Sequence, residues 1–182
     1  MDTNHAVEEK TYFGFWLYLL SDILLFASLF ATYGVLTSGT AGGLGPRQLV
    51  PLPTALAETL LLLVSSFVCS LTPRRKKGWV MVGLAMTLAL GCLFIGMVGS
   101  DFARLIQSGN SWERSAYLSA YFVLVGTLLF HMVMGLLWVL VLLGQIAQRG
   151  ITDSTYRRTV CFKMFWCFLN VIWVAIYHWV YL

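Results

Sequence analysis

The chain has 182 residues, of which 59% are hydrophobic and only 11% are charged. A soluble globular protein carries about 25% charged residues, so this chain has too little polar surface to face water on all sides. The composition excludes an ordinary soluble domain and indicates a protein whose solvent is the lipid bilayer. The net charge of +4 comes from basic residues between apolar segments, and without a basic face the sequence predicts no nucleic-acid partner.

Long apolar segments define the predicted architecture. Crossing about 30 Å of hydrocarbon takes about 20 apolar residues in a helix. Five segments reach that length, and the sequence predicts a single all-α transmembrane domain over residues 1–182. In chain order the predicted helices cover about 13–36, 53–71, 79–98, 117–146 and 160–182.

Basic residues mark one end of the predicted bundle. Lys and Arg collect in the connections on the cytoplasmic side of a membrane, so their bias places the N-terminus in the cytoplasm and the C-terminus outside. The residues on the predicted cytoplasmic side are Lys10, Arg74, Arg75, Lys76, Lys77, Arg149, Arg157, Arg158 and Lys163, against Arg47, Arg104 and Arg114 on the other side.

Pairs of small residues indicate where helices approach one another. Membrane helices favour small residues at their contacts, because these let two backbones come close. We expect helix contacts at the pairs spaced one turn apart, which are Ala27 with Ala31, Ser66 with Ser70, and Ala85 with Ala89.

Three ionisable side chains fall inside the predicted spans, where such groups are costly and usually face the bundle interior. Asp22 and His131 lie near the middle of the first and fourth spans, whereas Glu58 lies in the first turns of the second. One interpretation is a path for protons or ions through these residues. The other, which we favour, is that each is a protonated or hydrogen-bonded group that fixes helix packing, since burial tends to neutralise a carboxyl group.

The sequence predicts no catalytic, metal or cofactor site in this chain. A haem or a copper ion needs several converging ligands, and His131 is the one histidine deep in a predicted span. The four cysteines form no CxxC pair and are expected to be small buried apolar residues. They are Cys69, Cys92, Cys161 and Cys167.

The residues of all five predicted helices resemble one family of membrane proteins. The clearest stretch is FGFWLYLLSD at 13–22, continued by LFATY at 29–33. Further stretches are GTAGG at 39–43, ETLLLLVSS at 58–66, FIGM at 94–97, SAYF at 119–122, LVGT at 124–127, QIAQRG at 145–150, FW at 165–166 and VYL at 180–182. Over almost its whole length the chain resembles subunit III of bacterial cytochrome o ubiquinol oxidase, in the haem–copper terminal oxidase family.

The resemblance implies an accessory subunit of a respiratory-chain oxidoreductase in the bacterial inner membrane, with no active site of its own. In this family the haems, the copper and the proton-pumping machinery belong to the catalytic subunit I. Subunit III binds beside it in the complex, helps its assembly and stability, and holds phospholipid. The complex oxidises ubiquinol, reduces dioxygen to water and moves protons outward. The family's cytoplasmic N-terminus and periplasmic C-terminus agree with the orientation derived from the basic residues.

Four positions depart from the family's pattern. The family has an acidic residue directly after the Gly-Met of the third helix, a T-H-x-x-H motif in the fourth and W-H-F-x-D in the fifth. Here the changed positions are Val98, Leu128, Cys167 and Asn170, while Asp101 keeps the second acid of the third helix. These changes should leave the fold intact, because each removes the cost of burying an ionisable group. They weaken any proton-related role that the resemblance implies.

A small transporter is the competing function, in which Asp22 and Glu58 would bind a proton or a cation. Transporters tend to contain internal repeats and interrupted helices, and this sequence shows no repeat. A membrane-embedded enzyme would need converging catalytic groups, for which too few ionisable residues reach the membrane interior. The resemblance favours the oxidase subunit, and it favours ubiquinol over cytochrome c as the electron donor. It leaves open which helix faces contact subunit I and which lipids bind.

Overall fold

The computed structural model of the chain describes residues 2–37, 39, 51–71 and 76–181. Within these ranges five helices are long and apolar enough to cross a membrane, which confirms the predicted all-α architecture. The helical elements are α1 (Asp2–Leu36), α2 (Leu52–Leu71), α3 (Lys77–Gln107), α4 (Ala116–Arg149), α5 (Asp153–Ile176) and a final π-helical turn η2 (Tyr177–Tyr181).

Two helices run further than predicted because polar residues continue them. Helix α1 begins at Asp2 instead of near residue 13, and α3 continues to Gln107 instead of ending near residue 98. At about 1.5 Å per residue, the 31 residues of α3 exceed the roughly 30 Å hydrocarbon core. The predicted third helix ended at Val98, before Asp101. Asp101 is in fact buried, with 5% of its surface exposed.

Helix α5 begins at Asp153 instead of near residue 160. Thr152 caps its first turn, since the Thr152 Oγ1 accepts a hydrogen bond from the Thr155 N–H at 3.2 Å. The prediction counted apolar residues only, so it left out this polar first part, which contains Arg157 and Arg158.

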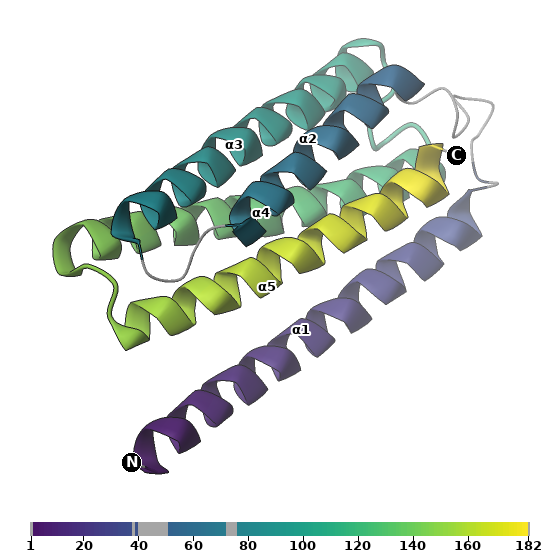
Figure 1. Ribbon diagram of the computed structural model, residues 1–182. Coiled ribbons are helices and arrows are strands. Elements are labelled where there is room, and N and C mark those ends of the chain that lie inside the picture. Colours follow the sequence, from purple (N-terminus) through teal and green to yellow (C-terminus); the bar gives the residue numbers. More distant parts are fainter. Residues whose placement is uncertain (1, 38, 40–50, 72–75, 182) are drawn as a thin grey trace.

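Helix α1 lies at the edge of the bundle and packs on α4 and α5 (Figure 1). Of the remaining helices, α2 packs on α3 and α5, and α4 packs on α3 and α5. The two ends of the chain lie at opposite ends of the bundle, as an odd number of spans requires (Figure 1). Arg47, Arg74 and Arg75 lie outside the described residues, and the membrane orientation stays a prediction.

The indole ring of Trp166 on α5 is a shared contact of four helices. It is fully buried, and its Nε1–H donates to the Ser65 Oγ on α2 at 3.1 Å. Gly91 on α3 and Gly135 on α4 leave room for the ring. A Cβ atom at Gly91 would lie 2.9 Å from Trp166 Cη2, and one at Gly135 would lie 3.2 Å from Trp166 Cζ3. The indole therefore leaves no room for a side chain at Gly91 and little room for one at Gly135.

A second tryptophan ties α5 to α2. The Trp173 Nε1–H donates to the Thr59 Oγ1 at 3.1 Å, and the Trp173 ring meets Phe94 edge-on with centroids 4.8 Å apart. A buried indole needs an acceptor for its N–H. Because α2 supplies a hydroxyl group to each indole, two hydrogen bonds set the height of α5 against α2.

The predicted helix contacts at the two alanine pairs are not present within this chain. The four alanines of these pairs are exposed, and the Ser70 hydroxyl donates to the Ser66 carbonyl within α2 at 2.9 Å. Residues one turn apart share a helix face, but the spacing does not tell which face meets a neighbour. The cysteines show the same limit, since only two of the four are buried. Cys69 and Cys161 are buried, whereas Cys92 and Cys167 are exposed.

Replacing Gly91 with alanine should destabilise the bundle by about 1–3 kcal/mol, the usual cost of overpacking a close-packed core. The added methyl group would lie 2.7 Å from Leu136 Cδ2 as well as against Trp166. Thermal unfolding in mild detergent, followed by tryptophan fluorescence, measures the change. Gly96→Ala on the same helix is the control, because nothing lies within 4 Å of a Cβ atom there. Equal stability of the two variants would contradict the packing described.

Candidate functional site

Asp22 and His131 lie together where α1 packs on α4. Asp22 Oδ1 is 3.8 Å from His131 Nε2, and the two side chains are 10% and 12% exposed. The Phe26 ring packs beside the imidazole with centroids 5.4 Å apart, and the Tyr18 hydroxyl lies within electrostatic range of the Asp22 carboxyl group. One face of α1 therefore supplies both the polar contact and its apolar cover.

The second nitrogen of His131 determines how many protons the pair needs. His131 Nδ1 lies 2.8 Å from the Thr127 carbonyl oxygen. A carbonyl oxygen only accepts, so Nδ1 carries a hydrogen, and a neutral imidazole then has none on Nε2. Attraction between Nε2 and the Asp22 carboxyl group requires one further proton, on either partner. At 3.8 Å the two atoms are beyond hydrogen-bonding distance.

Glu58 pairs with Asp101, a residue outside the predicted candidate set. Glu58 is 1% exposed and Asp101 is 5% exposed, and the two carboxyl groups lie within electrostatic range of one another between α2 and α3. Asp101 Oδ1 also lies 3.5 Å from Arg104 Nη1. Sequence reasoning placed Asp101 beyond the end of the third helix, although the family's second acidic position had marked it.

Buried tyrosines at the same end of the bundle form two bonded pairs. The hydroxyl oxygens of Tyr121 and Tyr181 are 3.0 Å apart, and those of Tyr33 and Tyr117 are also 3.0 Å apart. The first pair lies within electrostatic range of the Glu58 carboxyl group. Tyrosine is uncharged in water, so these hydroxyl groups did not stand out among the ionisable residues of the predicted spans.

The predicted set of three residues divides into two groups. Asp22 and His131 meet within the α1–α4 contact, whereas Glu58 lies with Asp101 near the end of the bundle that carries the α3–α4 turn. In the described part of the chain, no hydrogen bond or ion pair joins one group to the other. The candidate residues therefore lie at two separate places in the bundle.

Apolar or neutral side chains fill the four positions that depart from the family's pattern. Val98 and Leu128 are buried, with 2% and 0% exposed, and Cys167 is exposed. The Asn170 Nδ2–H donates to the Trp166 carbonyl oxygen at 2.8 Å, while the buried Asn170 Oδ1 has no hydrogen-bond partner. Val98, Leu128 and Asn170 therefore lie inside the bundle, whereas Cys167 lies on its surface.

Among the described residues, the surroundings of His131 are not those of a haem or copper ligand. Both ring nitrogens of His131 already face protein groups, which are the Thr127 carbonyl and the Asp22 carboxyl. Across residues 2–37, 39, 51–71 and 76–181, no three His, Cys, Asp or Glu side chains converge as a metal ion would require. The side chains of the two polar groups can bind protons and form hydrogen bonds.

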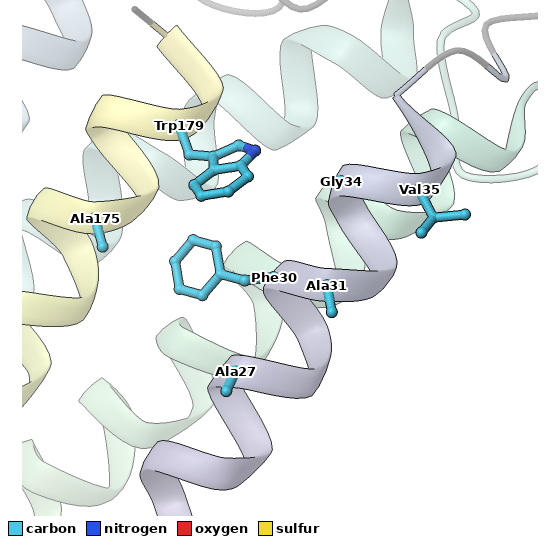
Figure 2. A pocket seen from close by; sticks show the side chains of 7 residues that line it. All are labelled: Ala27, Phe30, Ala31, Gly34, Val35, Ala175 and Trp179. Carbon is cyan, nitrogen blue, oxygen red and sulfur yellow. The ribbon is translucent and has the colours of Figure 1, made fainter.

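An apolar groove of about 690 Å³ lies between α1 and the C-terminal end of the chain. Figure 2 shows the rings of Phe30 and Trp179 turned toward one another within it, and their centroids are 6.3 Å apart. Small side chains leave the rest of the groove open, and they are Ala27, Ala31, Gly34 and Ala175.

A second groove, of about 500 Å³, lies at the opposite end of the bundle between α1, α4 and α5. Its lining combines the aromatic rings of Phe15 and Trp138 with the guanidinium groups of Arg157 and Arg158. A groove with this lining can hold an apolar chain and an anionic group side by side.

Comparison with known proteins gives a consistent result. Residues 2–182 match the family model described as cytochrome c oxidase subunit III. The chain is 44% identical to cytochrome bo(3) ubiquinol oxidase subunit 3 of Pseudomonas aeruginosa, over 100% of this chain and 90% of that protein. It is 36% identical to quinol oxidase subunit 3 of Bacillus subtilis, over 93% and 85%. It is 35% identical to cytochrome c oxidase subunit 3 of Bacillus sp. strain PS3, over 100% and 90%. These matches confirm the resemblance read from the motifs.

Removing one partner of the Asp22–His131 pair should cost more stability than removing both. His131→Leu leaves the Asp22 carboxyl group buried without its partner, and an unsatisfied buried polar group costs about 1–3 kcal/mol. The double variant Asp22→Leu/His131→Leu replaces the pair with an apolar contact and should recover most of that loss. Thermal unfolding of the wild type, both single variants and the double variant measures the coupling. Losses that simply add up would contradict direct pairing.

Proposed function

The chain belongs to the cytochrome c oxidase subunit III family, and on that basis we propose that it is subunit III of a haem–copper ubiquinol oxidase. In that complex it is a non-catalytic accessory subunit of the aerobic respiratory chain. It stabilises the catalytic subunit I, which carries the haems and the copper and pumps protons. The observation that carries the proposal is the family match over residues 2–182.

Ubiquinol is the proposed electron donor of the complex. The relative with 44% identity is named for ubiquinol, whereas the relative named for cytochrome c is 35% identical. The same matches favour an oxidase subunit over a proton- or cation-linked transporter. The separation of Asp22 from Glu58 in the bundle is a further reason against a transport path through both.

We place the N-terminus in the cytoplasm and the C-terminus in the periplasm of a bacterial inner membrane. Lys77, Arg149 and Arg158 lie toward the end of the bundle that holds the N-terminus, and the Lys77 Nζ there donates to the Ala147 carbonyl at 3.0 Å. Arg104 belongs to the last turn of α3, at the opposite end. The bias of basic residues toward one end supports the orientation.

Asp22, Glu58 and His131 act in this subunit as packing contacts or as contacts to neighbouring subunits and lipid. The Asp22–His131 pair joins α1 to α4, and Glu58 joins α2 to α3 through Asp101. Inside hydrocarbon no water competes for such groups, so each contact favours one arrangement of its two helices. The prediction for the leucine double variant tests the first of these contacts.

Phospholipid is the proposed occupant of the groove beside Arg157 and Arg158. The two guanidinium groups suit a phosphate, and the neighbouring rings of Phe15 and Trp138 suit an acyl chain. The apolar groove in Figure 2 suits an acyl chain at the other end of the bundle. Lipid held in this way fills gaps between α1 and the helices on which it packs.

Purification in mild detergent through a tag on this chain tests the proposed role. The preparation should contain b- and o-type haem bands in a redox difference spectrum, together with quinol oxidase activity, because the catalytic subunit binds this chain. The control is the same purification from cells that lack the catalytic subunit, which should give a colourless chain. A chain that purifies alone and colourless from cells that make the oxidase would contradict the proposal.

Changing Arg157 and Arg158 together to glutamine should reduce the phospholipid that stays bound through purification. Each basic residue near a membrane surface contributes about 1 kcal/mol of attraction to an anionic head group. Phosphorus per chain, and the lipid classes by mass spectrometry, measure the change. Arg149→Gln is the matched control, because Arg149 is exposed at the end of α4 and does not line this groove. Unchanged phosphorus in the double variant would argue against lipid in this groove.

A further inference from the structure

We propose that η2, the π-helical turn after α5, is a strap that holds the last turns of α1 against the bundle. One side chain of the strap, Tyr181, attaches it to α4, and another, Trp179, packs on α1. Release of the strap lets this end of α1 move away while the other helices stay packed. The proposal concerns contacts within this chain, so it does not depend on the oxidase assignment.

The strap begins where α5 changes from an α-helix to a π-helix. Helix α5 ends at Ile176, and the wider turn that follows covers Tyr177–Tyr181. Turns of this kind are rare, and they occur frequently at functional sites. The backbone of the strap packs on α5 and α2, so the strap reaches α1 and α4 through its side chains.

Tyr181 attaches the strap to α4. Its hydroxyl oxygen lies 3.0 Å from that of Tyr121, and the two side chains are buried, with Tyr121 fully so. A buried hydroxyl group needs a partner, because no water is available to it inside the bundle. The hydrogen bond between the two tyrosines therefore favours the position in which the strap lies against α4.

Trp179 connects the strap to α1. Residues two apart in a helix do not share a face, so Trp179 can meet α1 while Tyr181 meets α4. The Trp179 ring lies beside that of Phe30, with centroids 6.3 Å apart. A Cβ atom at Gly34, one turn further along α1, would lie 3.8 Å from Trp179 Cζ2. The indole therefore covers a full turn of α1, from Phe30 to Gly34 (Figure 2).

Helix α4 offers a hydroxyl group to α1 and another to the strap. The Tyr33 hydroxyl oxygen on α1 lies 3.0 Å from that of Tyr117, which is one turn before Tyr121 on the same helix. Lipid tails are as apolar as the helix surfaces, so apolar burial does little to keep α1 in place. The direct tyrosine bond and the strap therefore both contribute to holding this end of α1.

The strap also forms part of the apolar groove of about 690 Å³. Trp179 and Ala175 line one wall of this groove, and Phe30, Ala31 and Gly34 are among the α1 residues that line the other. Because the contact between Trp179 and α1 joins the two walls, release of the strap widens the groove. The position of the strap therefore controls how easily an apolar chain enters or leaves.

Thiol labelling of the intact chain in mild detergent tests the strap. Tyr33→Cys places a thiol on the buried face of α1 and removes the direct bond to α4, so a maleimide reacts there only while this end of α1 is detached. Mass spectrometry of the labelled peptide gives the rate at position 33. Adding Tyr181→Phe or Trp179→Ala should raise that rate about fivefold, the usual effect of losing one hydrogen bond or one aromatic contact.

Each added change has a matched control in the Tyr33→Cys chain. Tyr177→Phe removes a hydroxyl group from the same turn but keeps the Tyr121–Tyr181 bond, and Trp16→Ala removes an indole of α1 that is 54% exposed, against 59% for Trp179. Both controls should leave the rate at position 33 unchanged.

The native thiol of Cys69, which is buried on α2, reports on the bundle as a whole. Its labelling rate should stay the same in every variant, because only the end of α1 detaches. A rate at position 33 that neither Tyr181→Phe nor Trp179→Ala raises would overturn the proposal. An equal rise at Cys69 would also overturn it, since the whole bundle would then have loosened.

Discussion

The fit of one indole ring between two glycines organises this bundle. Lipid tails are as apolar as leucine, so burial of apolar surface does little to bring membrane helices together, and close packing and polar contacts decide the arrangement instead. Trp166 meets both conditions, since Gly91 and Gly135 make room for its ring and Ser65 accepts its N–H. Three helices are positioned against α5 by this residue, and the polar groups of the chain find their partners within that frame.

The polar interior follows from the scarcity of donors in a bilayer. Every ionisable group inside the bundle needs a partner from another helix, because no solvent reaches it. Asp22 lies beside the His131 imidazole on α4, and Glu58 lies near the Asp101 carboxyl group on α3. The first pair joins an acidic side chain to a basic one. The second brings two acidic side chains together between α2 and α3.

The sequence predicted the helices well and their contacts poorly. Long apolar runs indicate spans because the bilayer imposes a minimum length, and the number and order of the helices followed from that rule alone. The same counting of apolar residues placed the end of the third helix before Asp101, although a buried acid can lie inside a span. It gave no sign that Gly91 and Gly135 face Trp166, since which face of a helix meets which neighbour depends on the whole assembly. Asp22, Glu58 and His131 were found because charge is rare in such segments. Their partners could not be assigned from a single sequence.

The position of α1 has a consequence for how the chain is made. Among the described residues α1 packs on α4, on α5 and on the turn η2 that follows α5, so α1 is synthesised before the helices on which it packs. Until they enter the membrane, α1 has no neighbour for Asp22, and residues such as Leu24 and Val35, which are 72% and 78% exposed even in the finished chain, face lipid. The helices α2 and α3, which pack on one another, are neighbours in the chain and can associate as they emerge. Synthesis of this protein therefore passes through a stage in which a helical hairpin is complete while the first span is still alone in the bilayer.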